Sequence, residues 1–396
     1  MNRRQMLRLG AALPLAPLAF GTTVLWAAPR AGARLLVVFL RGGLDTHHLL
    51  VPIGSDFYYR VRPNIAIGRP GQENGAIGLD SYWGLHPAVL ETLAPMYLRK
   101  QLAFVPFAGT DDDSRSHFET QDSIELGQPL GGSRDFQSGF LNRLAQRLSA
   151  SRPIALTDQV PLAMRGRREI ANVALRSVAK PAVDARQRTL IASMYAGTRL
   201  AAAVNDGFGV REDVMKQLAN EMSDSARGAP PAKGFEAEAR RIGRLLADEF
   251  DLAFVDVGGW DTHVGQGAAT GYLANRLEEF GRGLRALADE MGPRWNDTVV
   301  IAISEFGRTF RENGNRGTDH GHGTAYLVLG GAVQGGRVVG EQRAIEEATL
   351  HENRDLPVLN EYRSVLGGLF ARLYGLNGAD LEAIFPQAKP KDLGLV

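Results

Sequence analysis

Short, unbroken apolar runs separated by helix-like stretches constrain the fold of this chain more than any other feature. Runs rich in branched residues, without polar alternation, are typical of strands buried on both faces of a parallel sheet. They occur at residues 34–40, 102–106, 252–257, 298–303 and 325–329. The stretches with helical spacing lie between and after them, at residues 87–99, 235–250, 272–290 and 361–374. This alternation predicts an α/β fold with a mostly parallel central sheet and helices on both faces.

The region between residues 151 and 234 departs from this pattern. Its strand signal is weak apart from two short apolar patches, and helical periodicity dominates at residues 183–205 and 211–222. We therefore predict a helical insertion at about residues 151–234, packed against the sheet. The insertion would belong to a single α/β domain that spans residues 34–396.

The N-terminus has the features of an export signal. Arg3 and Arg4 are adjacent, and a mildly apolar run follows at residues 9–28. This pattern predicts a twin-arginine signal peptide over residues 1–28, with the twin-arginine translocase as partner during export and the periplasm as destination. Two glycines and two prolines interrupt the run and disfavour a permanent membrane span, although an uncleaved anchor is the alternative. We expect no stable transmembrane segment after cleavage.

Composition narrows the chemistry. The chain has no cysteine, which excludes disulfides and thiolate ligands, so any metal must be held by imidazole, carboxylate or hydroxyl groups. The formal charge is +1, and removing the three arginines of the signal would lower it by three units to −2. A nearly neutral chain gives no electrostatic reason to expect a nucleic-acid partner.

Histidines gather near the predicted strand ends. Seven of the eight lie at or near loops that follow, or could follow, predicted strands: His47, His48, His86, His117, His263, His320 and His322. In parallel α/β sheets, ligands bind outside the carboxyl ends of the strands, where such loops converge. The distribution predicts a functional pocket at that edge.

Two polar clusters follow the first two predicted strands. Asp45 comes after two glycines and would face the crevice at the sheet edge, unless it only bonds its own backbone in a turn. His47 and His48 are open to either role. Ser116 lies where a helix begins, a position suited to a nucleophile or an anionic ligand. The alternative is a capping box formed by Ser116 and Glu119.

Asp261 and His263 follow a later strand. They are two residues apart, so in an extended loop both can point the same way and form half of a divalent-metal site. The alternative is a hydrogen-bonded structural pair.

The most specific local pattern lies between the last two long strands. Glu305 and Arg308 follow one strand, and Asp319, His320 and His322 precede the next, among glycines that allow tight curvature. These residues offer a carboxylate, a planar donor fork suited to an oxyanion, and further metal ligands.

Five motifs in the same order resemble the bacterial family catalogued as domain of unknown function 1501. They lie at residues 39–45, 114–118, 259–263, 304–308 and 319–323, after the twin-arginine start. That family looks like a distant branch of the alkaline phosphatase and sulfatase superfamily. The resemblance implies an alkaline-phosphatase-like fold that holds one or two metals at strand ends and transfers phosphoryl or sulfuryl groups.

The resemblance also implies roles for individual residues. Asp45 matches the metal aspartate of the superfamily's first strand, and Ser116 lies where the nucleophile begins a helix. Asp261 and His263 resemble the first ligand pair. Residues 304–306, Ser-Glu-Phe, stand where the superfamily has a Ser-Asp-His motif. This replacement keeps one carboxylate and loses one imidazole. Either His320 or His322 could supply the late histidine.

Together these features predict a periplasmic metal-dependent hydrolase of phosphate or sulfate esters. The proposed metal ligands are Asp45, Asp261, His263, Glu305, Asp319, His320 and His322. Ser116 would act as nucleophile, and Arg308 would hold the ester oxygens. Zinc, manganese, magnesium and calcium all remain open, and the substrate would be a small anionic ester or an envelope polymer. The alternative is a catalytically inactive binding or envelope-assembly protein on the same fold.

Overall fold

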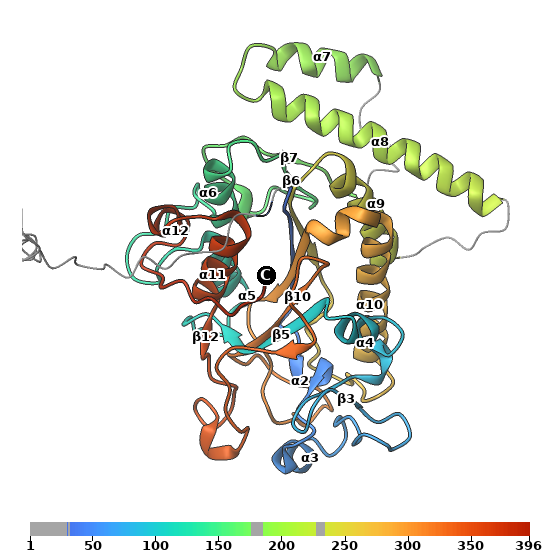
Figure 1. The fold of residues 1–396 in the computed structure, drawn as a ribbon, viewed down its shortest axis with the longest axis vertical. Coiled ribbons are helices and arrows are strands. Elements are labelled where there is room, and N and C mark those ends of the chain that lie inside the picture. The colour runs from blue at the N-terminus through green and yellow to red at the C-terminus, as the bar shows by residue number, and fades with distance from the viewer. Residues whose placement is uncertain (1–29, 31, 176–184, 227–233) are drawn as a thin grey trace, which may run out of the picture.

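The computed structural model describes residues 30, 32–175, 185–226 and 234–396 (Figure 1). The predicted signal peptide at residues 1–28 lies outside the described residues. Within them, the five long apolar runs form strands: β1 (Arg34–Leu40), β5 (Leu102–Gly109), β8 (Leu252–Val257), β9 (Thr298–Ser304) and β10 (Thr324–Leu329). Four shorter strands complete the sheet: β6 (Pro153–Ala155), β7 (Ala171–Asn172), β11 (Arg337–Val338) and β12 (Asn360–Glu361).

The sheet is mostly parallel, as predicted. Its order is β11-β5-β10-β9-β1-β8-β6-β7, and β12 also pairs with β5. Strand β10 runs antiparallel to both of its neighbours, and every other ladder of this sheet is parallel. The carboxyl ends of β1, β5, β8 and β9 therefore meet the amino end of β10 at one edge.

Helices cover both faces of the sheet (Figure 1). Alternate residues of β1 point to opposite faces: Leu36 and Val38 belong to one core cluster, and Leu35 and Val37 to the other. The first core packs against α4 (Leu93–Leu98), α9 (Phe235–Asp248) and α10 (Tyr272–Met291). The second packs against α5 (His117–Leu126), α6 (Phe140–Arg147), α11 (Tyr362–Tyr374) and α12 (Gly378–Ile384). Burial on both faces explains why the strands read as unbroken apolar runs.

A small second sheet lies below the edge at which the carboxyl ends of β1, β5, β8 and β9 meet, which we call the functional edge (Figure 1). It joins β2 (Leu50–Val51), β4 (Gly84–Leu85) and β3 (Ile77–Gly78), close to the short helices α2 (Thr46–Leu49) and α3 (Asp56–Val61). These elements belong to the long connection between β1 and β5.

The region predicted as a helical insertion contains strands as well as helices. Strands β6 and β7 extend the sheet beyond β8, because Ile154 and Ala155 pair with β8 and are buried. Two or three paired residues are too few for a recognisable strand period. Helices α7 (Ala185–Tyr195) and α8 (Ala201–Ala226) follow and lie beyond that end of the sheet (Figure 1). Among the described residues, we find no helix that combines the length and apolar character needed to cross a bilayer.

Candidate metal centre

Two loops meet at the functional edge of the sheet. One connects β8 to α10 (residues 258–271), and the other connects β9 to β10 (residues 305–323). Three backbone hydrogen bonds join them: Gly265 N to Asn315 O, Gln266 N to Arg316 O, and Thr318 N to Thr262 O, at 2.9, 3.0 and 3.0 Å. The contact needs a glycine, because a Cβ at residue 317 would lie 2.3 Å from the carbonyl oxygen of His263.

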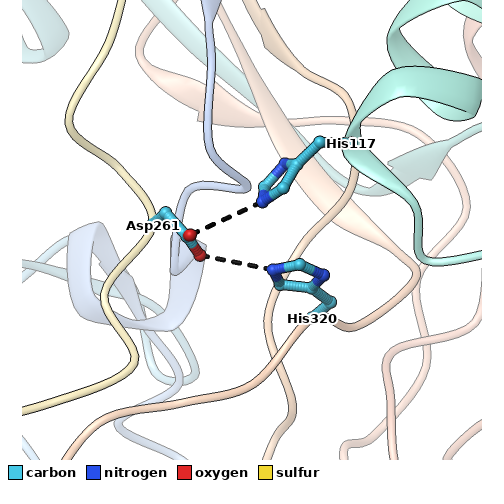
Figure 2. Close-up of side chains that lie close together, drawn as sticks. All are labelled: His117, Asp261 and His320. Carbon is cyan, nitrogen blue, oxygen red and sulfur yellow. Dashed lines mark ion pairs between the residues drawn. The ribbon is translucent and has the colours of Figure 1, made fainter.

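Three imidazoles converge on the carboxylate of Asp261. The Nε2 atom of His263 lies 2.9 Å from Oδ1 of Asp261, and Nε2 of His320 lies 3.3 Å from the same oxygen. The Nε2 atom of His117, at the start of α5, lies 3.6 Å from Oδ2 (Figure 2). The ligand atoms of His117, Asp261 and His320 all lie within 4.8 Å of one another, and no other such group of three occurs among the described residues.

The orientation of the three rings follows from their other nitrogen. Each Nδ1 faces an oxygen: Glu305 Oε1 for His117 (2.8 Å), Asp319 Oδ1 for His263 (3.1 Å) and the Arg115 carbonyl for His320 (2.9 Å). Ionised carboxylates and carbonyls only accept hydrogen bonds, so these partners assign the proton of each neutral ring to Nδ1. Each Nε2 is then left with its lone pair directed toward Asp261.

This donor set fits a bound cation. The Nε2 atoms of His263 and His320 lie 3.0 Å apart, beside the Asp261 carboxylate. Two lone pairs and an anionic oxygen at this separation repel one another unless a proton or a cation lies between them. Metal-ligating histidines characteristically donate their second ring N–H to a carboxylate or a backbone carbonyl, as all three rings do.

Glu305 lies behind His117 rather than among the converging Nε2 atoms. Its Oε1 accepts hydrogen bonds from Gly42 N, Gln121 Nε2 and the His117 ring, each at 2.8 Å. Its Oε2 accepts from the Ser304 hydroxyl at 3.0 Å. Burial raises the pKa of Glu305, but the hydrogen bonds from His117 and Gln121 outweigh it and hold that pKa below its ordinary value. Glu305 is therefore an anion that orients His117.

Arg308 contacts Asp261 directly. The side chain is buried, and Nη1 donates to Asp261 Oδ1 at 2.7 Å while Nη2 donates to the Thr318 carbonyl at 2.8 Å. Partial burial raises the pKa of Asp261, but the hydrogen bond and charge of Arg308 outweigh it and lower that pKa. Arg308 thus keeps Asp261 ionised and fixed in position.

Asp45 lies outside this cluster, although the sequence predicted it as a metal ligand. It is fully buried and forms a two-pronged ion pair with Arg62, at 2.6 and 3.1 Å. Burial raises the pKa of Asp45, but the charge of Arg62 outweighs it and places that pKa well below its ordinary value. A guanidinium therefore occupies the position at Asp45 where the sequence predicted a metal ion.

The structure also places the remaining predicted residues. His322 packs against His351, with ring centroids 4.7 Å apart, and is not part of the group formed by His117, Asp261 and His320. Asp319 bonds His263 from behind. Ser116 caps α5, because its hydroxyl accepts from Glu119 N at 3.5 Å, and it directly precedes His117.

Sequence reasoning did not select His117 as a ligand. Within residues 114–118, the sequence predicts Ser116 as the functional residue. The signal was available, since His117 follows a strand just as His263 does. The supporting amide Gln121 gave no such signal, because its role depends on a contact with Glu305, which lies far away in sequence.

A family model described as "Protein of unknown function (DUF1501)" matches residues 32–385. The chain belongs to this family. The resemblance read from the five motifs of this DUF1501 protein is thereby confirmed. No curated protein matches the sequence.

Solved structures are similar to this DUF1501 protein only at low identity and low TM-score. The lipoteichoic acid synthase LtaP from Listeria monocytogenes is 11% identical, with a TM-score of 0.38 over 92% of this chain and 76% of that one. A protein of the alkaline phosphatase superfamily from Vibrio parahaemolyticus is 12% identical, with a TM-score of 0.34 over 83% and 69%. A third, Ps i-CgsB in complex with k-i-k-neocarrahexaose, is 8% identical, with a TM-score of 0.37 over 91% and 75%. Likeness at this level carries no information on activity.

Proposed function

We propose that this DUF1501 protein is a metal-dependent hydrolase of phosphate or sulfate esters. The observation that carries the proposal is the convergence of three Nε2 atoms on Asp261, each on a ring whose Nδ1 is already engaged. The metal would be held by His117, His263, His320 and the Asp261 carboxylate. The choice of ester hydrolysis rests on the motifs that resemble the alkaline phosphatase and sulfatase superfamily.

The types of ligand atom limit which metal ions the site can bind. Three imidazoles and one carboxylate suit zinc or iron, whereas magnesium and calcium prefer all-oxygen sites. Of the four ions left open by the sequence, we therefore propose zinc first and manganese second.

The side chains around the centre would have different roles in ester hydrolysis. A bound divalent metal polarises an ester oxygen and lowers the pKa of a coordinated hydroxyl or water. Glu305 and Asp319 hold His117 and His263 by their Nδ1 protons, and Arg308 keeps Asp261 ionised. Ser116, adjacent to His117, would supply the nucleophilic hydroxyl.

Metal analysis and hydrolysis assays on purified protein test this proposal. We expect about one equivalent of metal per chain, and hydrolysis of an aryl phosphate, phosphodiester or aryl sulfate that chelation abolishes. His320→Ala should lose both the metal and the activity. His351→Ala is the matched control, because it removes an imidazole outside the cluster and should retain both. A wild-type protein in which every divalent metal is present at less than about a tenth of an equivalent contradicts the proposal.

The second candidate is an inactive binding or envelope-assembly protein on the same fold. It is favoured by Arg308, the group predicted to hold ester oxygens, whose Nε, Nη1 and Nη2 all donate to protein atoms. A protein that binds one metal but hydrolyses none of the three ester classes would support this candidate over the hydrolase.

We further propose that the protein is exported by the twin-arginine translocase and acts in the periplasm, on a small anionic ester or an envelope polymer. The support is the sequence of residues 1–28. Replacing Arg3 and Arg4 together by lysine should retain the precursor in the cytoplasm, as shown by fractionation and immunoblotting. Export of the doubly substituted chain at the wild-type rate would contradict this route.

A further inference from the structure

A buried glutamine connects the two loops that carry the candidate metal centre. Gln266 is fully buried and uses all four hydrogen-bonding positions of its side-chain amide. Its Nε2 donates to Asp45 Oδ2 at 2.8 Å and lies 3.4 Å from His48 Nδ1. Its Oε1 accepts from the hydroxyls of Thr262 and Thr318, at 3.2 and 3.1 Å.

The direction of each of these hydrogen bonds is determined. Asp45 is an ionised carboxylate held by Arg62, so it can only accept, and the amide nitrogen of Gln266 must face it. The ring of His48 agrees, because its Nε2 faces the Ala268 carbonyl at 2.9 Å and must donate there, which leaves Nδ1 as an acceptor. The amide oxygen therefore faces the two threonine hydroxyls.

Thr318 extends this connection to the metal centre. Its hydroxyl donates to Gln266, so a lone pair remains to accept the hydrogen bond from Arg308 Nε at 3.3 Å. Arg308 in turn donates from Nη1 to Asp261 at 2.7 Å. Thr262 makes the same contact with Gln266 but has no such link to Arg308.

We infer that Gln266 is a positioning residue, which uses the buried Asp45–Arg62 ion pair as a reference to fix Thr318, Arg308 and through them Asp261. Asp45 thereby contributes to the site as the anchor of this chain of hydrogen bonds. Its consequence for metal binding rests on the proposed function, whereas the position of Asp261 does not.

Neither glutamate nor methionine, the two side chains most similar to glutamine in size, can replace Gln266 in this role. Glutamate has the same shape but lacks both amide donors and adds a negative charge beside Asp45. Methionine has similar length but can neither donate to Asp45 nor accept strongly from the hydroxyls.

Two threonine variants give the sharpest test, because they remove equivalent hydroxyls from the same amide oxygen. Thr318→Val removes the hydroxyl that joins Gln266 to Arg308 Nε but keeps the backbone carbonyl that accepts from Arg308 Nη2, and Thr262→Val leaves both contacts of Arg308 intact. We expect the crystal structure of metal-free Thr318→Val to show the Arg308 Nη1–Asp261 Oδ1 distance beyond about 3.5 Å, the limit of a hydrogen bond. The Thr262→Val structure should keep it. Metal affinity, measured by competition with a chromophoric chelator, should fall about 10-fold to 100-fold in Thr318→Val.

Gln266→Met extends the test, with Asn142→Leu as control for the loss of a buried amide elsewhere. Asn142 is fully buried and donates to the carbonyls of Met164 and Arg168, on the other face of the sheet. Both variants should lower the melting temperature, but only Gln266→Met should weaken metal binding. Equal Arg308–Asp261 distances in the two threonine variants would overturn the inference. A wild-type protein that binds no metal would contradict the proposed function. The inference about Gln266 would still be tested by the Arg308 Nη1–Asp261 Oδ1 distance in the two threonine variants.

Discussion

The Nε2 atoms of His263 and His320 lie 3.0 Å apart, although His263 follows β8 and His320 precedes β10, two strands that β1 and β9 separate in the sheet. Both rings are held from behind, by Asp319 and by the Arg115 carbonyl. These contacts fix both rings, so the positions of the loops determine the short distance between the two Nε2 atoms. The following predictions test which contacts keep the loops in place.

Glu305→Gln should weaken metal binding without removing a ligand. The variant keeps the size of the side chain but replaces the anion that accepts the Nδ1 proton of His117. We expect metal affinity to fall about 10-fold to 100-fold, with one equivalent still bound at saturation. Chelator competition measures both quantities. Complete loss of binding would instead make Glu305 a direct ligand.

Gly317→Ala should separate the two loops. The added methyl would lie 2.3 Å from the carbonyl oxygen of His263, so the backbone must move. We expect a loss of about 1–3 kcal/mol in the free energy of unfolding and weaker metal binding. Gly314→Ala in the same loop is the control, because nothing lies within 4 Å of a Cβ there. Equal behaviour of the two variants would show that the close contact has no consequence.

Asp45→Asn should destabilise the protein strongly. It leaves the fully buried guanidinium of Arg62 without its counter-charge, which typically costs about 3–5 kcal/mol. Denaturant unfolding of the metal-free protein measures the effect, and metal at saturation should still reach one equivalent. Asp56→Asn, in an exposed ion pair with Arg69, should have a much smaller effect. Loss of the metal equivalent in Asp45→Asn would restore Asp45 as a ligand.

The free energy of unfolding should fall as the pH is lowered from about 6.5 toward 4. Burial lowers the pKa of His47 and His48 to about 3 and that of His86 to about 4, so these rings stay neutral in the folded protein. The unfolded chain takes up their protons below its ordinary pKa, and each ring contributes a slope of up to about 1.4 kcal/mol per pH unit. The contribution of these neutral rings to the free energy of unfolding is therefore complete above about pH 6.5 and is progressively lost as the pH falls toward their folded pKa values. Unfolding curves of metal-free protein across this range that superimpose would contradict the burial of these rings.

Ser116 can be tested without losing its helix cap. Ser116→Asn keeps a good N-cap for α5 but removes the hydroxyl, so stability should hold while hydrolysis falls by about a hundredfold or more. Ser116→Ala should lose both. Full activity in Ser116→Asn would assign the attack to water rather than to this serine.

The sequence predicted the long strands of the sheet well, because burial on both faces requires apolar residues along the whole strand. Strand β1 is buried along its whole length, and its apolar run gives its bounds directly. Strand β6 gave only a short apolar patch and β7 gave no strand signal, because each pairs over only two or three residues.

The site was predicted only in part, for a related reason. Sequence identifies which residues lie next to strand ends, and Asp261 and His263 after β8 come together with His320 before β10. It does not show where a partner from another segment lies. Arg62 neutralises Asp45, and His351 packs against His322, through contacts that no local spacing announces.

The reversed direction of β10 has a consequence for how the centre is built. Had β10 run parallel to β9, the chain would have had to cross the sheet between them, and only one end of that connection would reach the functional edge. Because β10 is antiparallel to β9, residues 305–323 leave and re-enter the sheet on the same side. A single hairpin connection thus supplies Arg308 from its outgoing arm and His320 from its returning arm. Its tip, through Asn315 and Arg316, is hydrogen-bonded to the loop that carries Asp261 and His263, so one segment both contributes side chains to the centre and holds the second loop beside them.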